Sequence, residues 1–274
     1  MQRKRQSIAS VVLGMVLGMA LVGVLGFAVW TRAARYEAFP EASVLARQAS
    51  VSRGWLVFQP PKNEGQEPDT GLIFYPGGLV DPAAYAPLMR RLADAGLLVV
   101  MVPMPLDLAI FGVDSASKVI PTYPEIRHWL IGGHSLGGAM AAEFVKRHPD
   151  LVRGESTPLL SVKENAAESG RLEGLVLLAS YPARSTDLSA LPLHVVSIYG
   201  SEDGVTSAEF EHSLRRLPSD TRLMRLEGAN HAQFGNYGPQ KGDGTATIER
   251  AQQQSLTVEA VRELVTRIHQ HQPD

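Results

Sequence analysis

The chain has 274 residues, of which 45% are hydrophobic, and its 26 basic and 28 acidic residues leave a formal net charge of −2. This balance is that of an ordinary globular protein and gives no electrostatic basis for binding nucleic acid or acidic ligands. The chain contains no cysteine, which excludes disulfides, thiolate metal sites and a cysteine nucleophile. We therefore do not expect nucleic acid to be a partner of this protein.

The first distinctive segment is an uncharged apolar stretch of 23 residues from Ile8 to Trp30. As a helix it is about 34 Å long, enough to cross the roughly 30 Å hydrocarbon layer of a membrane. The alternative is a cleaved signal peptide, whose apolar region is usually about 7–15 residues and ends at a small-residue cleavage site that residues 27–36 lack. The sequence favours a short basic tail at 1–7, a transmembrane signal-anchor at 8–30 and a linker at 31–50.

Charges on either side of this segment indicate its orientation. Arg3, Lys4 and Arg5 precede it, whereas Arg32 and Arg35 follow it and weaken the bias. Because basic residues tend to stay on the cytoplasmic side, we expect a single-pass protein with a cytoplasmic amino terminus. The remaining domain, residues 51–274, is then extracytoplasmic, in the periplasm or outside the cell.

Apolar runs that end at proline or glycine follow one another through the rest of the chain and alternate with helical patterns. Such alternation predicts an α/β fold with a mostly parallel sheet and helices on both faces. Strands are expected at 54–58, 72–75, 97–102, 129–131, 175–179, 195–199 and 222–226, and helices at 88–95, after residue 135 and at 258–269.

The pentapeptide Gly133-His134-Ser135-Leu136-Gly137 lies between one of these strands and a helix. Gly-x-Ser-x-Gly in this context predicts a nucleophile elbow, a sharp turn that exposes the serine. Gly133 and Gly137 are needed because only a hydrogen side chain lets the strand and helix approach closely there.

A serine hydroxyl needs a base to activate it and a third group to orient that base. Asp203 follows the strand at 195–199, and His231 follows the strand at 222–226, so both are expected at the same sheet edge as Ser135. Glu202 is the nearest rival for the acidic position. The chain order Ser, Asp, His is the one that this type of fold uses.

The segments GGHSLGG (132–138), YGSEDGV (199–205) and GANHAQF (228–234) resemble those of the α/β-hydrolase superfamily. The resemblance extends from about Gly54 to His269 and is greatest to compact, lidless members such as dienelactone-hydrolase-like proteins and small carboxylesterases. Dienelactone hydrolase itself has a cysteine at the position of Ser135. By this resemblance Ser135 is the nucleophile, His231 the general base and then acid, and Asp203 the orienting carboxylate.

The reaction also needs amides that bind the oxyanion. The resemblance implies the amide of Leu136 and one near Gly78, although Pro76 replaces the family's histidine before the glycine pair. Residues 179–193 are too few for a helical lid. Residues 103–123 are expected to form either an apolar wall of an acyl or alcohol pocket or a loop packed on the core. The loop 233–244, with Asp243, is expected to be either a ligand or metal site or a structural turn.

The sequence thus favours a membrane-anchored serine hydrolase that cleaves small-molecule carboxylic esters through an acyl-enzyme, with no cofactor and no metal. A thioesterase or acyltransferase using the same triad is an alternative. A catalytically silent, membrane-tethered binding module is an alternative of another class.

Overall fold

A computed structural model describes residues 2–61, 68–153, 170–206 and 209–270. The chain divides into two compact units, residues 1–35 and 36–274. The first unit is a single helix, α1 (Gln2–Ala33), so the predicted basic tail and apolar span are continuous from Gln2. Its segment Val12–Ala33, 22 residues long, has the length and composition of a candidate membrane span, although a signal sequence meets the same criteria.

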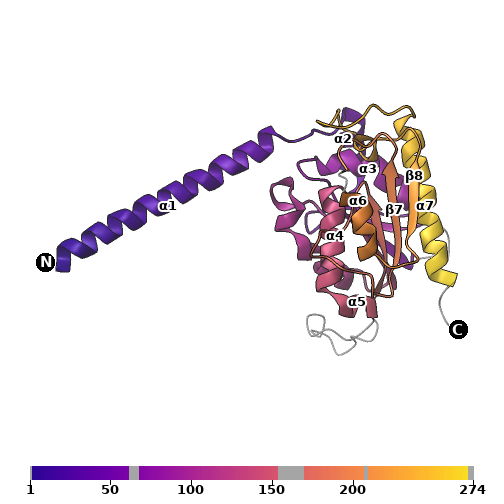
Figure 1. The fold of residues 1–274 in the computed structure, drawn as a ribbon, viewed down its shortest axis with the longest axis horizontal. Coiled ribbons are helices and arrows are strands. Elements are labelled where there is room, and N and C mark those ends of the chain that lie inside the picture. The colour runs from indigo at the N-terminus through magenta and orange to yellow at the C-terminus, as the bar shows by residue number, and fades with distance from the viewer. Residues whose placement is uncertain (1, 62–67, 154–169, 207–208, 271–274) are drawn as a thin grey trace. The chain divides into compact units, whose positions relative to one another are not determined.

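The second unit is built on one eight-stranded sheet (Figure 1). The strand order is β1-β2-β4-β3-β5-β6-β7-β8. The β1–β2 and β2–β4 pairs are antiparallel, and all other neighbours are parallel. The strands are β1 (Ser50–Ser52), β2 (Trp55–Phe58), β3 (Thr70–Tyr75), β4 (Leu98–Met101), β5 (His128–His134), β6 (Arg171–Leu178), β7 (His194–Gly200) and β8 (Arg222–Leu226). The predicted fold class is confirmed.

Helices cover both faces of this sheet, as expected for parallel strands that are buried on both sides. Helices α2 (Pro40–Gln48), α3 (Ala86–Asp94) and α7 (Arg250–Gln270) pack on one face. Helices α4 (Leu136–Arg147) and α5 (Pro149–Arg153) pack on the other, where Figure 1 also shows α6 (Glu209–Ser213). Each face has its own hydrophobic cluster.

The second unit begins earlier than expected. Residues 31–50 are predicted as a linker, but Tyr36 donates its amide to the Leu79 carbonyl at 2.7 Å, and α2 buries Ala42 and Ala46. Two small buried residues one turn apart, in a segment that is polar on average, give too weak an apolar pattern to predict a helix. Helix α7 likewise begins eight residues before the predicted start, at Arg250. Its first turns bury polar side chains such as Gln253 and Gln254, so they lack the apolar pattern from which a buried helix is predicted.

Residues 103–123 fold into short 3₁₀ helices at Pro105–Asp107, Ala109–Phe111, Val113–Lys118 and Ile120–Thr122. Val113 and Ala116 pack in the core, so the core-packing interpretation holds for this part. Leu106, Ile110 and Phe111 remain 39%, 49% and 52% exposed. Residues 179–193, between β6 and β7, contain no helix, as predicted for that segment.

Candidate active site

Ser135 occupies a strained turn between β5 and α4. Its backbone angles are φ 52° and ψ −122°, a conformation that side-chain-bearing residues rarely adopt. The turn is held by the Ser135 amide, which donates to Leu178 at 2.9 Å, and by the Ser180 hydroxyl, which donates to the Ser135 carbonyl at 2.7 Å. Tertiary contacts from β6 and the residues after it therefore fix the serine in the strained conformation expected of an elbow.

The glycines on either side of Ser135 are required by space. A Cβ at Gly137 would clash with the carbonyl oxygens of Tyr75 and Pro76. A Cβ at Gly133 would lie 2.6 Å from the Tyr75 oxygen and 2.5 Å from the Gly137 carbonyl carbon. Strand β3, the elbow and α4 thus pack backbone to backbone, in agreement with the predicted role of both glycines.

Asp203 and His231 meet at the carboxyl edge of the sheet, in the loops after β7 and β8. His231 Nδ1 and Asp203 Oδ2 are 3.0 Å apart, and the two side chains are only 1% and 2% exposed. Asp203 also accepts the amides of Val205 and Thr206 at 2.9 and 2.8 Å and the Thr206 hydroxyl at 2.6 Å. Glu202, the rival acid, is exposed, and among the described residues its carboxylate accepts only the Ser201 hydroxyl.

The Asp203 carboxyl is ionised at neutral pH. Burial by itself raises its pKa, but the hydrogen bond and charge of His231 and the bonds from Thr206 outweigh burial and lower the pKa to about 2. An ionised carboxylate can only accept hydrogen bonds, so His231 Nδ1 carries the donated proton. In a neutral imidazole with its proton on Nδ1, the other ring nitrogen, Nε2, carries the lone pair that a general base uses.

His231 Nε2 is buried and has no hydrogen-bond partner within the described parts of the chain. Its ring packs on that of His134, the residue before Ser135, with centroids 4.5 Å apart. No hydrogen bond joins Ser135 Oγ to His231 in the described residues, which is common in sites without substrate. The structure therefore brings Asp203 and His231 into direct contact and holds the histidine ring against the residue next to the serine.

A second hydrogen-bonded group, not predicted from the sequence, lies behind the histidine. Tyr85 accepts the Gly77 amide at 3.0 Å, and its hydroxyl is 2.8 Å from His134 Nδ1. Both Tyr85 and His134 are fully buried. Burial lowers the pKa of His134 far below its ordinary value and the neighbouring His231 lowers it further, so His134 is neutral. No local motif marks a contact between residues 49 positions apart.

The loop 233–244 has a structural role through Asp243. Its carboxylate accepts the amides of His231 at 3.0 Å, Ala232 at 2.8 Å and Gly244 at 2.9 Å. A Cβ at Gly204 would clash with the Gly242 carbonyl oxygen, so the same loop packs closely against the turn that carries Asp203. Of the two interpretations of this loop, the structural turn fits these contacts.

Gly78 and Leu136, whose amides are the predicted oxyanion donors, lie in contact with each other. A Cβ built on Gly78 would be 3.0 Å from Leu136 Cδ2 and 3.7 Å from Leu108 Cδ2. In the loop after β3, the amides of Gly77 and Leu79 are bonded to Tyr85 and Asp107, and Pro76 has none. The Gly78 amide accordingly lacks an acceptor among the described residues, and the Leu136 amide, first in α4, has no partner within its helix.

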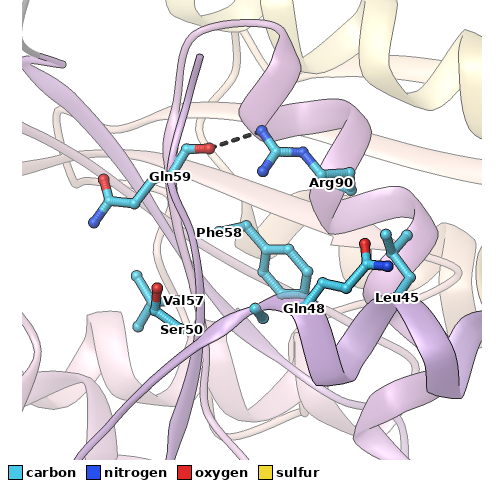
Figure 2. Close-up of a pocket in the computed structure, with 8 residues that line it drawn as sticks. Leu45, Gln48, Ser50, Val57, Phe58, Gln59 and Arg90 are labelled. Atoms are coloured by element: carbon cyan, nitrogen blue, oxygen red, sulfur yellow. Dashed lines mark hydrogen bonds between the residues drawn. The ribbon is translucent and has the colours of Figure 1, made fainter. Parts of the chain in front are cut away.

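One cavity, of about 230 Å³, lies elsewhere (Figure 2). It is formed by α2, β1, β2 and α3, and Arg90 donates across its rim to the Gln59 carbonyl at 2.7 Å. None of the predicted catalytic or oxyanion residues lines it, so it is separate from the site described above.

Comparison with solved structures shows the same fold in esterases of very different sequence. Esterase 2 of Thermogutta terrifontis, in a form phosphoramylated by tabun, is 16% identical, with a TM-score of 0.53 over 82% of this chain and 94% of that one. The acetyl ester-xyloside bifunctional hydrolase of Caldicellulosiruptor lactoaceticus is 12% identical, with a TM-score of 0.51 over 77% and 88%. An esterase domain from a Rhodothermus marinus protein is 11% identical, with a TM-score of 0.51 over 80% and 96%.

No curated protein sequence matches the chain. Residues 71–255, which carry the elbow and both the Asp203 and His231 loops, match the alpha/beta hydrolase family. This match covers more than half of the chain and agrees with the sheet order and with the solved structures. The chain belongs to the alpha/beta hydrolase family.

Proposed function

We propose that this protein is a serine hydrolase that cleaves carboxylic esters through an acyl-enzyme. The observation that carries the proposal is the buried Asp203–His231 pair. The His231 ring packs on that of His134, next to Ser135, and its Nε2 has no hydrogen-bond partner among the described residues. A buried aspartate that fixes the tautomer of a histidine beside a strained serine is the arrangement that activates a hydroxyl for acyl transfer.

In the acylation step, Ser135 Oγ attacks the ester carbonyl while His231 Nε2 takes the hydroxyl proton. The negative charge that develops on the carbonyl oxygen is stabilised by the amides of Leu136 and Gly78. Collapse of the tetrahedral intermediate breaks the ester bond, and His231 gives its proton to the departing alcohol. Water, deprotonated by His231, then attacks the acyl-enzyme, releases the acid and restores Ser135.

The test combines fluorophosphonate labelling of the full-length protein in detergent micelles with hydrolysis of p-nitrophenyl acetate and butyrate. We expect labelling and turnover in wild type and loss of both in Ser135→Ala and His231→Ala. The exposed residues Ser255 and His212 provide matched controls, because Ser255→Ala and His212→Ala remove the same groups from α7 and α6.

A folded wild type that neither labels nor hydrolyses any ester would refute the proposal and favour the binding-module alternative. Faster turnover of thioesters than of matched oxygen esters would favour a thioesterase. Product partition toward an added alcohol or amine, rather than toward water, would favour an acyltransferase. All three enzymatic outcomes require the same triad.

We also propose that α1 anchors the protein in a membrane and leaves the catalytic unit extracytoplasmic. The support is its apolar segment Val12–Ala33 together with the basic residues Arg3, Lys4 and Arg5 that precede it. Only Ala34 and Arg35 separate α1 from Tyr36, whose amide bonds to Leu79, next to Gly78. A link this short spans roughly 10 Å, so an inserted α1 would hold the catalytic unit at the membrane surface.

This anchoring is tested by cell fractionation. We expect the full chain to stay in the membrane pellet after a carbonate wash and the form that starts at Arg35 to be soluble. Protease added outside the cytoplasmic membrane should digest the catalytic unit. A full chain that is shortened by cleavage near residue 30 and released would establish a signal peptide instead.

A further inference from the structure

A cluster of metal-ligand side chains lies at the opposite edge of the sheet from Ser135. Asp69 precedes β3, His128 begins β5, and His269 lies in the last turn of α7. One donor atom from each lies within 4.8 Å of the others, and the two imidazole rings have centroids 5.1 Å apart. Two histidines and one carboxylate from three distant parts of the chain thus converge on one point.

The surroundings of His128 match those of a metal-bound histidine. Glu173, on β6, contacts His128 Nδ1 at 3.1 Å. A carboxylate on one ring nitrogen fixes the tautomer and orients the other nitrogen, which is the usual second contact of a histidine that binds zinc. Glu173 and His128 are only 17% and 14% exposed, so the pair is held in place by packing.

The charge of the cluster also favours a cation. Asp69 and Glu173 supply two carboxylates, and within the described residues neither forms an ion pair with a lysine or arginine. Asp69 accepts the Thr70 hydroxyl at 2.8 Å, and that hydroxyl is 3.0 Å from His269 Nε2. Two partly buried carboxylates beside two imidazoles are a set of donor groups that can surround a divalent cation.

We propose that Asp69, His128 and His269 bind a divalent transition-metal ion of the zinc type, with Glu173 orienting His128. Imidazole nitrogen with carboxylate oxygen suits Zn²⁺, whereas Mg²⁺ and Ca²⁺ prefer oxygen ligands alone. Ligands of a tetrahedral zinc lie about 3.3 Å apart at bond lengths of roughly 2.0–2.1 Å, so the side chains need to close by less than about 2 Å. Water would complete the coordination.

The proposed ion would be structural. It would tie the end of α7 to the starts of β3 and β5. A hydrogen bond between Thr70 and His269, 199 positions apart in the sequence, already joins α7 to β3. The site is separated from Ser135 by the full length of β5, roughly 23 Å for seven residues. We therefore expect zinc to change stability and to leave ester turnover unaffected.

The experiment measures zinc binding by isothermal titration calorimetry and the thermal midpoint Tm with and without ZnCl₂, using full-length protein without a polyhistidine tag. We expect one site per chain and a Tm increase of roughly 5–10 °C at zinc concentrations about 100 times the Kd. His128→Ala and His269→Ala should abolish the increase. Glu173→Gln should weaken binding by roughly 10–100-fold.

His212→Ala is the matched control, because His212 is an exposed histidine on α6, and it should keep the full Tm increase. His269 is itself exposed, so His269→Ala should fold even where His128→Ala does not. No zinc-dependent increase in wild type, the same increase in His269→Ala, or an equal increase with MgCl₂ would each overturn the proposal.

Discussion

Replacing Tyr85 with phenylalanine separates stabilisation of the fold from positioning of the loop after β3, which carries Gly78, a proposed oxyanion donor. Its hydroxyl accepts the Gly77 amide and bonds His134 Nδ1. Burial raises the pKa of Tyr85, so the hydroxyl keeps its proton over the working pH range. Tyr85→Phe leaves both partners buried without a bond, and each such group costs about 1–3 kcal/mol. We expect a loss of unfolding free energy of about 2–6 kcal/mol.

Catalysis should be affected as well. The Gly77 amide is adjacent to Gly78, and His134 packs on the His231 ring. Removal of an oxyanion donor costs about 100–1,000-fold in kcat, so a loop that holds the donor less firmly should lose a part of this, roughly 10-fold. The effect should fall on kcat rather than KM, because the oxyanion bond strengthens in the transition state.

Tyr75 provides the matched control. It is also fully buried, and its hydroxyl donates to the Val113 carbonyl and accepts the Ala116 amide, both at 2.8 Å. Tyr75→Phe should lose a similar unfolding free energy in urea titrations and keep kcat within about twofold once folded. An equal kcat loss in both variants, or none in Tyr85→Phe, would refute a positioning role for Tyr85.

Two further predictions concern the acids of the site. Asp243→Asn weakens the acceptor for the His231 and Ala232 amides, so it should lower kcat and the fluorophosphonate labelling rate roughly 10-fold. Asp220→Asn is the control, because it alters only an exposed ion pair with Arg267 and should change neither rate. The lowered pKa of Asp203, about 2, means that its stabilising contribution is complete above its ordinary pKa near 3.8 and is lost as pH falls through 2. Urea titrations should show this loss in wild type between about pH 4 and 2, and its absence in Asp203→Asn.

The sheet was predictable because its central strands are short apolar runs buried on both faces. Every predicted strand corresponds to one in the structure, and β1 was missed because its three residues are largely exposed. Helix α2 was missed for a related reason, since only Ala42 and Ala46 are buried in it. Elements with little buried apolar surface leave little pattern in a sequence.

The elbow and the loops of Asp203 and His231 were also predictable, because each follows a strand at the same edge of a parallel sheet. The contacts that hold them were not. Tyr85 with His134 and Asp243 with His231 join residues 49 and 12 positions apart through side chains that match no local motif. Their partners are decided by how helix α3 and the late loops pack, which depends on the whole fold.

Backbone strain and the proposed metal site lie at opposite edges of the sheet. Leu79, Ser135 and Ala179 have positive φ values of 56°, 52° and 46° at or near the carboxyl edge. Each costs about 1–3 kcal/mol, which neighbouring contacts must offset for the site to keep its geometry. A metal tie between α7 and the starts of β3 and β5 would add stability at the other edge, away from Ser135 and the strained turns near it. On this reasoning, zinc should raise Tm equally in wild type and in Ser135→Ala, since the strain at the elbow and the proposed tie act on separate contacts.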